Sequence, residues 1–205
     1  MKTVTLALFC GVTLLFMNCS TNRPKRKEVS QLQNCANELK IYAQQKGYST
    51  KYCLLIDMSL NSGLKRFFVY DLTKNTVAFS GLVAHGSCDQ LFLKDVKFSN
   101  TPESGCTSSG LFRVGRSYRG HYGKAYKLYG LQSSNSNAFK RAVVIHGLNC
   151  VPDKESYPNP ICNSSGCPMV SFAFLEKLSF VIDHSDKPVL LWIYGRHTTM
   201  ERLRS

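Results

Sequence analysis

The sequence lacks the features that mark several common classes of protein. Beyond its first 19 residues it has no apolar run close to the roughly 18 residues that a membrane-spanning helix needs. It has no CxxC pair, which argues against a zinc site. It also has no helix-turn-helix or zinc-finger pattern, no internal repeat and no low-complexity tract. The sequence therefore predicts one globular domain.

Acidic residues are scarce as well. The chain has 13 Asp and Glu against 26 Lys and Arg, which gives a formal net charge of +13. Such a charge attracts anionic polymers. Apart from residues 25–27, the cations are scattered among predicted strands and loops, and an exported chain does not meet nucleic acid. We therefore expect no nucleic-acid partner and favour an anionic polymer of the cell envelope.

The N-terminus has the pattern of an export signal. Lys2 precedes an apolar stretch, residues 4–17, which is too short to span a membrane comfortably. The "FMNC" that follows resembles a bacterial lipobox, with Cys19 as the residue to be acylated. We therefore expect a signal peptide at 1–18 and a lipid-anchor tether at 19–28, which together place the protein at the periplasmic face of the cell envelope. The alternative is an uncleaved anchor.

Cysteine, in contrast, is abundant, with nine residues. If Cys10 leaves with the signal and Cys19 carries lipid, an odd number remains, so one thiol stays free or pairs between chains. Proximity in sequence favours three disulfides: Cys35–Cys53, Cys88–Cys106 and Cys150–Cys162.

Hydrophobic periodicity predicts a β-rich α+β domain. Apolar residues at helical spacing predict an amphipathic helix within 29–50, packed on a domain formed by residues 51–205. A second helix is predicted over 170–183. Strands are predicted at 52–58, 65–72, 76–86, 111–115, 125–131, 141–147 and 188–195. The long irregular segment at 87–110 is of a length that is usually functional.

Two residues suit nucleophilic catalysis. A thiol attacks a carbonyl carbon as thiolate, so it needs a neighbouring base. His146 ends a predicted strand, and Cys167 lies 21 residues later, beyond an irregular excursion that allows the two to meet. Gly166 permits a tight turn in which backbone N–H groups face an oxyanion. A helix directly behind Cys167 would add partial positive charge. The alternatives are a disulfide for Cys167 and a structural role for His146.

The segments "VVIHG" and "SSGCPMV" resemble the His-Gly and Ser-x-Gly-Cys motifs of the YkuD-type L,D-transpeptidase catalytic domain. The segments "FFVYDL", "LVAHG", "FSNTPESGCTSSGLFRVG" and "RAVVIHG" resemble, in order, further signatures of its murein lipoprotein branch. The resemblance extends from about Tyr52 to Tyr194. It implies the β-sandwich or barrel of that family, with an N-terminal amphipathic helix and a helix following the cysteine.

The resemblance also implies roles at the site. Cys167 becomes the nucleophile and His146 the general base, with the backbone carbonyl of Gly147 orienting the imidazole. The backbone N–H groups of Gly166 and Cys167 would form the oxyanion hole. The residues implied on the substrate side are Ser164, Ser165, Asn100, Thr101, Pro102 and His121.

Two points in this comparison stay open. For His121 and for His85, which also lies in a matching segment, the alternative is a structural role. Many members of the family have Arg or Asn where Met169 stands here, so another cation would have to replace that side chain. The arginines considered for this are Arg113, Arg116 and Arg119, whose alternative is an ordinary solvated surface.

The implied activity is a cysteine-dependent peptidoglycan L,D-transpeptidase. It acts on stem tetrapeptides through a thioester, releases D-Ala and forms cross-links between third residues, without metal or organic cofactor. The expected partners are stem peptides and, through the lipid on Cys19, a membrane, and we expect a monomer. The alternatives are an L,D-carboxypeptidase or endopeptidase at the same site, and a non-catalytic murein-binding lipoprotein in which Cys167 is in a disulfide.

Overall fold

The computed structural model describes residues 23–196, with side chains from residue 31 onward. The elements along the chain are α1 (Arg23–Lys46), β1 (Tyr52–Asp57), β2 (Phe67–Asp71), β3 (Thr76–Gly81), β4 (Gly110–Gly120), β5 (Gly123–Gly130), a 3-10 helix (Ser133–Asn135), β6 (Val144–Gly147), β7 (Met169–Val170), α2 (Phe172–Asp183) and β8 (Leu190–Tyr194). This order confirms the predicted β-rich α+β class. The predicted signal peptide and Cys19 lie outside the described residues.

The strands form one mixed sheet in the order β3-β2-β1-β8-β4-β5-β6-β7. The pairs β1–β8 and β6–β7 are parallel, and the other neighbouring pairs are antiparallel. The last strand along the chain, β8, therefore lies inside the sheet between β1 and β4. Within residues 23–196, no helix is long and apolar enough to cross a membrane.

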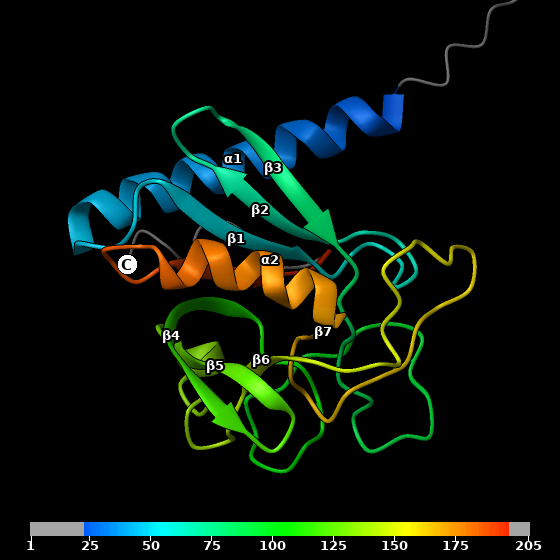
Figure 1. Ribbon diagram of the computed structural model, residues 1–205. Helices are drawn as coiled ribbons and strands as arrows, with labels where there is room; N and C mark the ends of the chain where they lie inside the picture. The colour runs from blue at the N-terminus through cyan, green and yellow to red at the C-terminus, as the bar shows by residue number, and fades with distance from the viewer. Residues whose placement is uncertain (1–22, 197–205) are drawn as a thin grey trace, which may run out of the picture.

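The main core lies between α2 and one face of the sheet (Figure 1). Leu178 of α2 is fully buried in this cluster, to which β1, β2 and β4 to β8 all contribute apolar side chains. Leu54, Ile145 and Leu191 are examples from strands at different positions in the sheet. The predicted sandwich or barrel is thus realised as a single sheet that wraps around α2.

A second cluster joins α1 to the opposite face of the sheet, so the two helices lie on opposite sides of β1 to β3 (Figure 1). Leu32, Leu39 and Ala43 share one face of α1, because their spacing follows the helical repeat, and they pack with Leu55 and Trp192. This confirms the predicted amphipathic helix. The burial of its apolar face is what holds α1 to the domain.

Several predicted boundaries differ from those of the structure. Helix α1 begins at Arg23, so part of the expected tether at 19–28 is helical. Pro24 is tolerated there, because an N–H in the first turn has no partner within the helix. The strand expected at 141–147 begins only at Val144, after Ala142, whose φ of 55° is incompatible with an extended strand.

The segment behind Cys167 also differs from the prediction. Strand β7 comes first, and α2 begins at Phe172 instead of residue 170. Ser171 sets this start, because its side chain accepts a hydrogen bond from the N–H of Phe174. The helix N-terminus expected directly behind the thiol is therefore separated from it by β7.

Two of the three predicted disulfides are confirmed, Cys88–Cys106 and Cys150–Cys162. The third prediction is wrong. Cys35 and Cys53 remain thiols in the cluster between α1 and the sheet. Burial there raises the pKa of the Cys35 thiol to about 12, so both residues serve as small apolar side chains.

Candidate active site

The pairing of β6 with β7 brings the two predicted catalytic residues together. His146 lies opposite Met169 in this parallel pair. The same register, continued two residues back along each chain, places Cys167 beside Val144. The Val144 N–H donates to the Cys167 sulfur at 3.5 Å, in agreement with this register. His146 and Cys167 thus lie on neighbouring segments at the edge of the sheet, and the Cys167 sulfur contacts the backbone of Val144 and Ala142.

Cys167 is a free and partly exposed thiol. Its sulfur lies 3.8 Å from the carbonyl oxygen of Ala142 and receives the hydrogen bond from Val144. Burial raises the pKa of the Cys167 thiol, whereas the Val144 N–H and the positive charge of Arg141 act in the opposite direction. The thiol is thus protonated at rest and needs a base to become a nucleophile.

His146 has the geometry of such a base. Its side chain is buried, and its Nδ1 lies 3.2 Å from the carbonyl oxygen of Gly147. A carbonyl accepts only from an N–H, so this contact assigns the proton to Nδ1 and leaves Nε2 as the acceptor. Burial lowers the pKa of His146, with the Gly147 hydrogen bond opposing the shift. The imidazole is therefore neutral near pH 7.

An aromatic ring that the sequence analysis did not identify covers His146. Tyr122, in the turn between β4 and β5, stacks on the imidazole with ring centroids 4.5 Å apart and an interplanar angle of 17°. The ring of His121 lies edge-on to the ring of Tyr122, and the two ring centroids are 4.8 Å apart. Tyr122 is half exposed, so its sequence position carries no burial pattern that would have revealed it.

The turn before the nucleophile depends on glycine. Gly166 has a φ of +113°, and a Cβ there would lie 2.7 Å from the carbonyl oxygen of Cys106. The buried Ser164 hydroxyl stabilises this turn through two hydrogen bonds. It accepts one from the Gly166 N–H at 3.1 Å and donates one to the Cys167 carbonyl at 2.7 Å. The Gly166 N–H, expected in the oxyanion hole, is thus hydrogen-bonded to Ser164. The Cys167 N–H has no acceptor within residues 23–196.

The expected substrate-side loop is fastened to the domain. The Asn100 side chain donates to the Ser133 carbonyl at 2.8 Å and accepts from the Asn137 N–H at 3.0 Å. Its amide therefore holds residues 97–108 against the 3-10 helix. Thr101 and Pro102 are exposed, as is Ser165 in the nucleophile turn.

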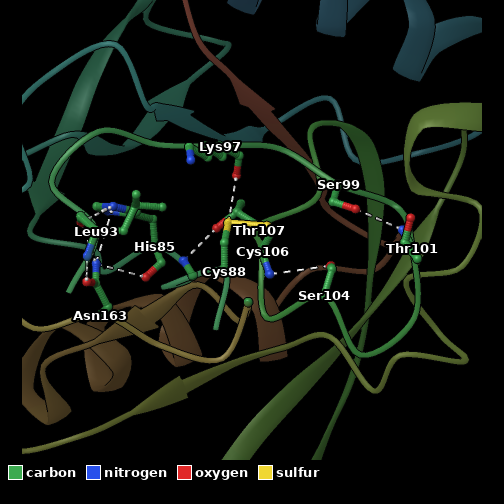
Figure 2. The surroundings of a disulfide bond; sticks show 12 residues. His85, Cys88, Leu93, Lys97, Ser99, Thr101, Ser104, Cys106, Thr107 and Asn163 are labelled. Atoms are coloured by element: carbon green, nitrogen blue, oxygen red, sulfur yellow. Dashed lines mark hydrogen bonds between the residues drawn. A yellow bond between two sulfur atoms is a disulfide. The ribbon is translucent and has the colours of Figure 1, made fainter. Parts of the chain in front are cut away.

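The same loop is closed by the Cys88–Cys106 disulfide (Figure 2). Arg141 reaches it from the segment just before β6 and donates four hydrogen bonds. The acceptors are the carbonyl oxygens of Ser99 and Cys106 and the hydroxyls of Ser104 and Ser108. Sequence reasoning missed Arg141, because it was taken as the first residue of a strand.

Three arginines were candidates to replace the Arg or Asn that many family members have at the position of Met169. The structure places none of them in contact with Met169 or Cys167 among the described residues. Met169 is itself buried beside His146. Arg113 on β4 lies over the ring of Tyr129, 3.8 Å from its centroid. Arg116 and Arg119 are exposed on the same strand. Arg141 is the arginine whose charge acts on Cys167.

His85 has a structural role, as the alternative reading expected. Its ring is fully buried, with Nδ1 at 2.8 Å from Arg66 Nη2 and Nε2 at 2.9 Å from the Leu93 carbonyl oxygen (Figure 2). Burial first, and then the positive charge of Arg66, lower the pKa of His85 to about 4. Its Nδ1 therefore accepts from Arg66 while its Nε2–H donates to Leu93.

A cavity of about 690 Å³ lies away from the thiol. Its lining includes Met58, Arg66, Phe98 and Arg196, but neither Cys167 nor His146. The chemistry of the Cys167 site therefore does not extend to this cavity.

A sequence profile of the L,D-transpeptidase catalytic domain family matches residues 24–194. No curated protein matches the sequence. Among solved structures, the helical cell shape determining protein Pgp2 from Campylobacter jejuni is 17% identical, with a TM-score of 0.45, and the match covers 72% of this chain and 48% of that chain. The Ldtfm-avibactam carbamoyl enzyme is 13% identical, with a TM-score of 0.46 and coverage of 72% of this chain and 50% of that chain.

An L,D-transpeptidase from Xylanimonas cellulosilytica is 17% identical, with a TM-score of 0.40, and the match covers 74% of this chain and 67% of that chain. The matched part of this chain spans about half the length of the first two structures.

Proposed function

Because this chain belongs to the L,D-transpeptidase catalytic domain family, we propose that it is a peptidoglycan L,D-transpeptidase with Cys167 as nucleophile and His146 as general base. The observation that supports this best is that a free, partly exposed thiol and an imidazole whose Nδ1 is held by Gly147 lie on neighbouring segments of the sheet edge. The non-catalytic alternative requires Cys167 in a disulfide, and in the structure its sulfur has none.

In the first half-reaction Nε2 of His146 takes the Cys167 proton, and the sulfur attacks the carbonyl of the third, diamino residue of a donor tetrapeptide. The tetrahedral intermediate carries its negative charge on oxygen. Its collapse breaks the bond to D-Ala, whose amine leaves with the proton from His146. A thioester between Cys167 and the donor remains.

In the second half-reaction the side-chain amine of a neighbouring stem attacks the thioester. His146 accepts the proton of the amine, the C–S bond breaks, and the proton returns to the sulfur. The product is a cross-link between two third residues. Water in place of the amine would give the tripeptide, so acceptor choice depends on water exclusion.

The oxyanion of both intermediates needs backbone donors. The Cys167 N–H is available for this, whereas the Gly166 N–H would first have to give up its bond to Ser164. Of the expected substrate-side residues, Ser164 and Asn100 are engaged in internal hydrogen bonds. The exposed ones, which a stem peptide can reach, are Ser165, Thr101, Pro102 and His121.

The first test is intact-mass analysis after addition of a carbapenem, a β-lactam that acylates thiols of this family. We expect one covalent adduct on the wild-type chain and none on Cys167→Ala. An adduct that persists in Cys167→Ala would show that the nucleophile lies elsewhere. The absence of any adduct on wild type would favour the non-catalytic alternative.

A second experiment separates transpeptidation from hydrolysis. The protein is incubated with purified tetrapeptide muropeptides, and the products are resolved by liquid chromatography and mass spectrometry. Cross-linked dimers with release of D-Ala support the transpeptidase. Tripeptide without dimers would instead assign the carboxypeptidase or endopeptidase activity to the same Cys167 site.

We also propose that the protein works in the cell envelope, because its substrate is peptidoglycan. Attachment to a membrane through Cys19 remains part of this proposal, since that residue lies outside the described residues. Metabolic labelling with a clickable fatty acid, compared between wild type and Cys19→Ser, tests it. Loss of label in Cys19→Ser is the expected result.

A further inference from the structure

The guanidinium of Arg141 is surrounded by neutral oxygen atoms. Its Nη1 donates to the Ser99 carbonyl at 2.7 Å and to the Ser108 hydroxyl, and its Nη2 donates to the Ser104 hydroxyl at 3.2 Å and the Cys106 carbonyl at 2.7 Å. In the part of the chain that the structure describes, no carboxylate forms a salt bridge with Arg141. The half-buried cation therefore has hydrogen bonds but no counter-charge.

A partly buried charge without a counter-ion is costly, and charges of this kind are normally paired. The groups that accept hydrogen bonds from Arg141 are all neutral, and the exposed Glu103 of the same loop forms no salt bridge with it. A neighbouring group that is ionised for part of the time can supply the missing negative charge. The Cys167 side chain is such a group, because it is a neutral thiol at rest and becomes a negative thiolate during the reaction.

Arg141 lies next to the turn that carries the sulfur. Its Nη2 is 3.4 Å from the position that a Cβ on Gly166 would occupy, which is the residue before Cys167. The two residues that contact the sulfur lie just after Arg141 in the chain: Ala142 is the next residue, and Val144 follows two residues later. Ala142 has a φ of 55°, which is unfavourable for a residue with a Cβ. The chain thus maintains a strained residue between the arginine and the backbone that contacts the sulfur.

From this geometry we propose that Arg141 is a positioning residue that supplies the counter-charge of the Cys167 thiolate. The inference rests on the proposed role of Cys167 as nucleophile. The loop of residues 99–108 acts as a rigid holder, because it accepts four hydrogen bonds from the guanidinium and is itself closed by the Cys88–Cys106 disulfide, which Figure 2 shows. The charge effects that Arg141 and Cys167 exert on each other agree with this arrangement.

Alkylation of Cys167 by iodoacetamide tests the inference without any peptidoglycan. Rates are followed by peptide mass mapping from pH 6 to pH 10 on the oxidised full chain, with Cys167→Ser as the background control. The variants are Arg141→Gln, which removes the charge, and Arg141→Lys, which keeps it. Arg113→Gln is the matched control, because Arg113 lies over Tyr129 instead of beside the sulfur.

An opposite charge within about 4–6 Å favours the ionised form of a group and lowers the pKa of an acid by about one unit or more. We therefore expect Arg141→Gln to raise the midpoint of alkylation by about one pH unit and to slow the reaction at pH 8 by roughly fourfold to tenfold. Arg141→Lys is expected to stay within about half a pH unit of wild type, and Arg113→Gln to be unchanged. A folded Arg141→Gln protein with the wild-type midpoint would overturn the inference.

Ser104→Ala separates the charge from the hydrogen bonds. This variant removes one acceptor of Arg141 but leaves the guanidinium in the chain. We expect the wild-type midpoint, and a shift as large as that of Arg141→Gln would overturn the inference in favour of a purely structural role. If Arg141→Gln does not fold, Arg141→Met, which also removes the charge, takes its place: a midpoint raised by about one pH unit supports the inference, and the wild-type midpoint refutes it.

The alkylation experiment tests the role of Arg141 independently of the transpeptidase activity. Alkylation measures ionisation of the sulfur, whether or not the protein transfers peptides. A shifted midpoint in Arg141→Gln together with no D-Ala release by wild type would support the role of Arg141 and contradict the transpeptidase.

Discussion

Burial moves the proton affinities of the two reacting side chains apart. It raises the pKa of the Cys167 thiol and lowers the pKa of the His146 imidazole. Both groups are therefore neutral in the resting protein at pH 7, and a preformed thiolate–imidazolium pair is disfavoured. In the proposed mechanism the proton therefore moves as the sulfur attacks, so that His146 acts as a general base in the strict sense.

Tyr122 provides a test of this point, since its ring covers the imidazole. We expect Tyr122→Ala to hydrate His146 and to raise its pKa toward the ordinary value, as measured by NMR titration of the imidazole. The acid limb of D-Ala release should move to higher pH with it. Because Tyr122 is half exposed, the free energy of unfolding should change by less than about 1 kcal/mol.

Tyr157→Ala is the control, since Tyr157 is also exposed and does not contact His146. An unchanged titration of His146 in Tyr122→Ala would show that the ring does not set the environment of the base.

His85 makes the stability of the protein depend on pH. Its pKa falls from the ordinary 6.5 to about 4 through burial and the Arg66 charge. As the pH falls, the His85 side chain takes up a proton in the unfolded chain at a higher pH than in the folded protein. Neutral His85 therefore causes no loss of stability above pH 6.5, and the folded protein loses stability as the pH falls from 6.5 toward 4. Between pH 7 and pH 5 the expected loss in the free energy of unfolding is about 2 kcal/mol.

Denaturant unfolding of the oxidised protein at both pH values measures this loss. His85→Gln keeps a donor and an acceptor but does not titrate, so its unfolding free energy should fall less over the same range. His146 contributes equally in both proteins. The same pH dependence in His85→Gln and wild type would contradict the assignment.

At the scale of elements, α1 is held by a single apolar face. Leu39 is fully buried against the sheet, whereas Ile41 on the other side of the helix is 55% exposed. Leu39→Ala should lower the free energy of unfolding by about 2–5 kcal/mol, because it removes contacts and leaves a cavity. Ile41→Ala should change it by less than about 0.5 kcal/mol.

Urea unfolding curves of the two variants measure this difference. Equal effects at the two positions would mean that α1 is not docked on the sheet as described.

Most elements could be predicted from the sequence, because a buried face repeats along the chain. The stripe of α1 and the apolar strands around Ile56 and Ile193 are examples. Strand β7 was missed, because two residues are too few for a period. The Cys35–Cys53 disulfide was wrongly predicted, because closeness in sequence says nothing about whether two buried sulfurs are bonded.

The candidate site was predictable in part for a different reason. His146 and Cys167 lie in short motifs, so the sequence indicated them directly. Tyr122 and Arg141 are placed near these residues by contacts between segments far apart in the chain. Such contacts depend on strand order and loop closure, neither of which leaves a local pattern.

At the scale of the whole molecule, the excess of basic residues predicts salt-dependent retention on anionic cell-wall material. The formal charge is +13, and raising the ionic strength from about 0.01 M to about 1 M shortens the Debye length from about 30 Å to about 3 Å. Co-sedimentation with purified sacculi should therefore decrease as salt increases. Cys167→Ala should behave like wild type, since its charge is the same. Retention that is insensitive to salt would contradict an electrostatic origin.

The position of β8 affects how the protein reaches its native state. Among the named strands, β8 alone pairs with both β1 and β4 and so joins β3-β2-β1 to β4-β5-β6-β7, while an isolated bridge links Ala84 to Met169. A ribosome must therefore have passed residue 194 before the two halves can close on each other. Until then each half presents an open strand edge, which is the kind of surface through which incomplete chains aggregate.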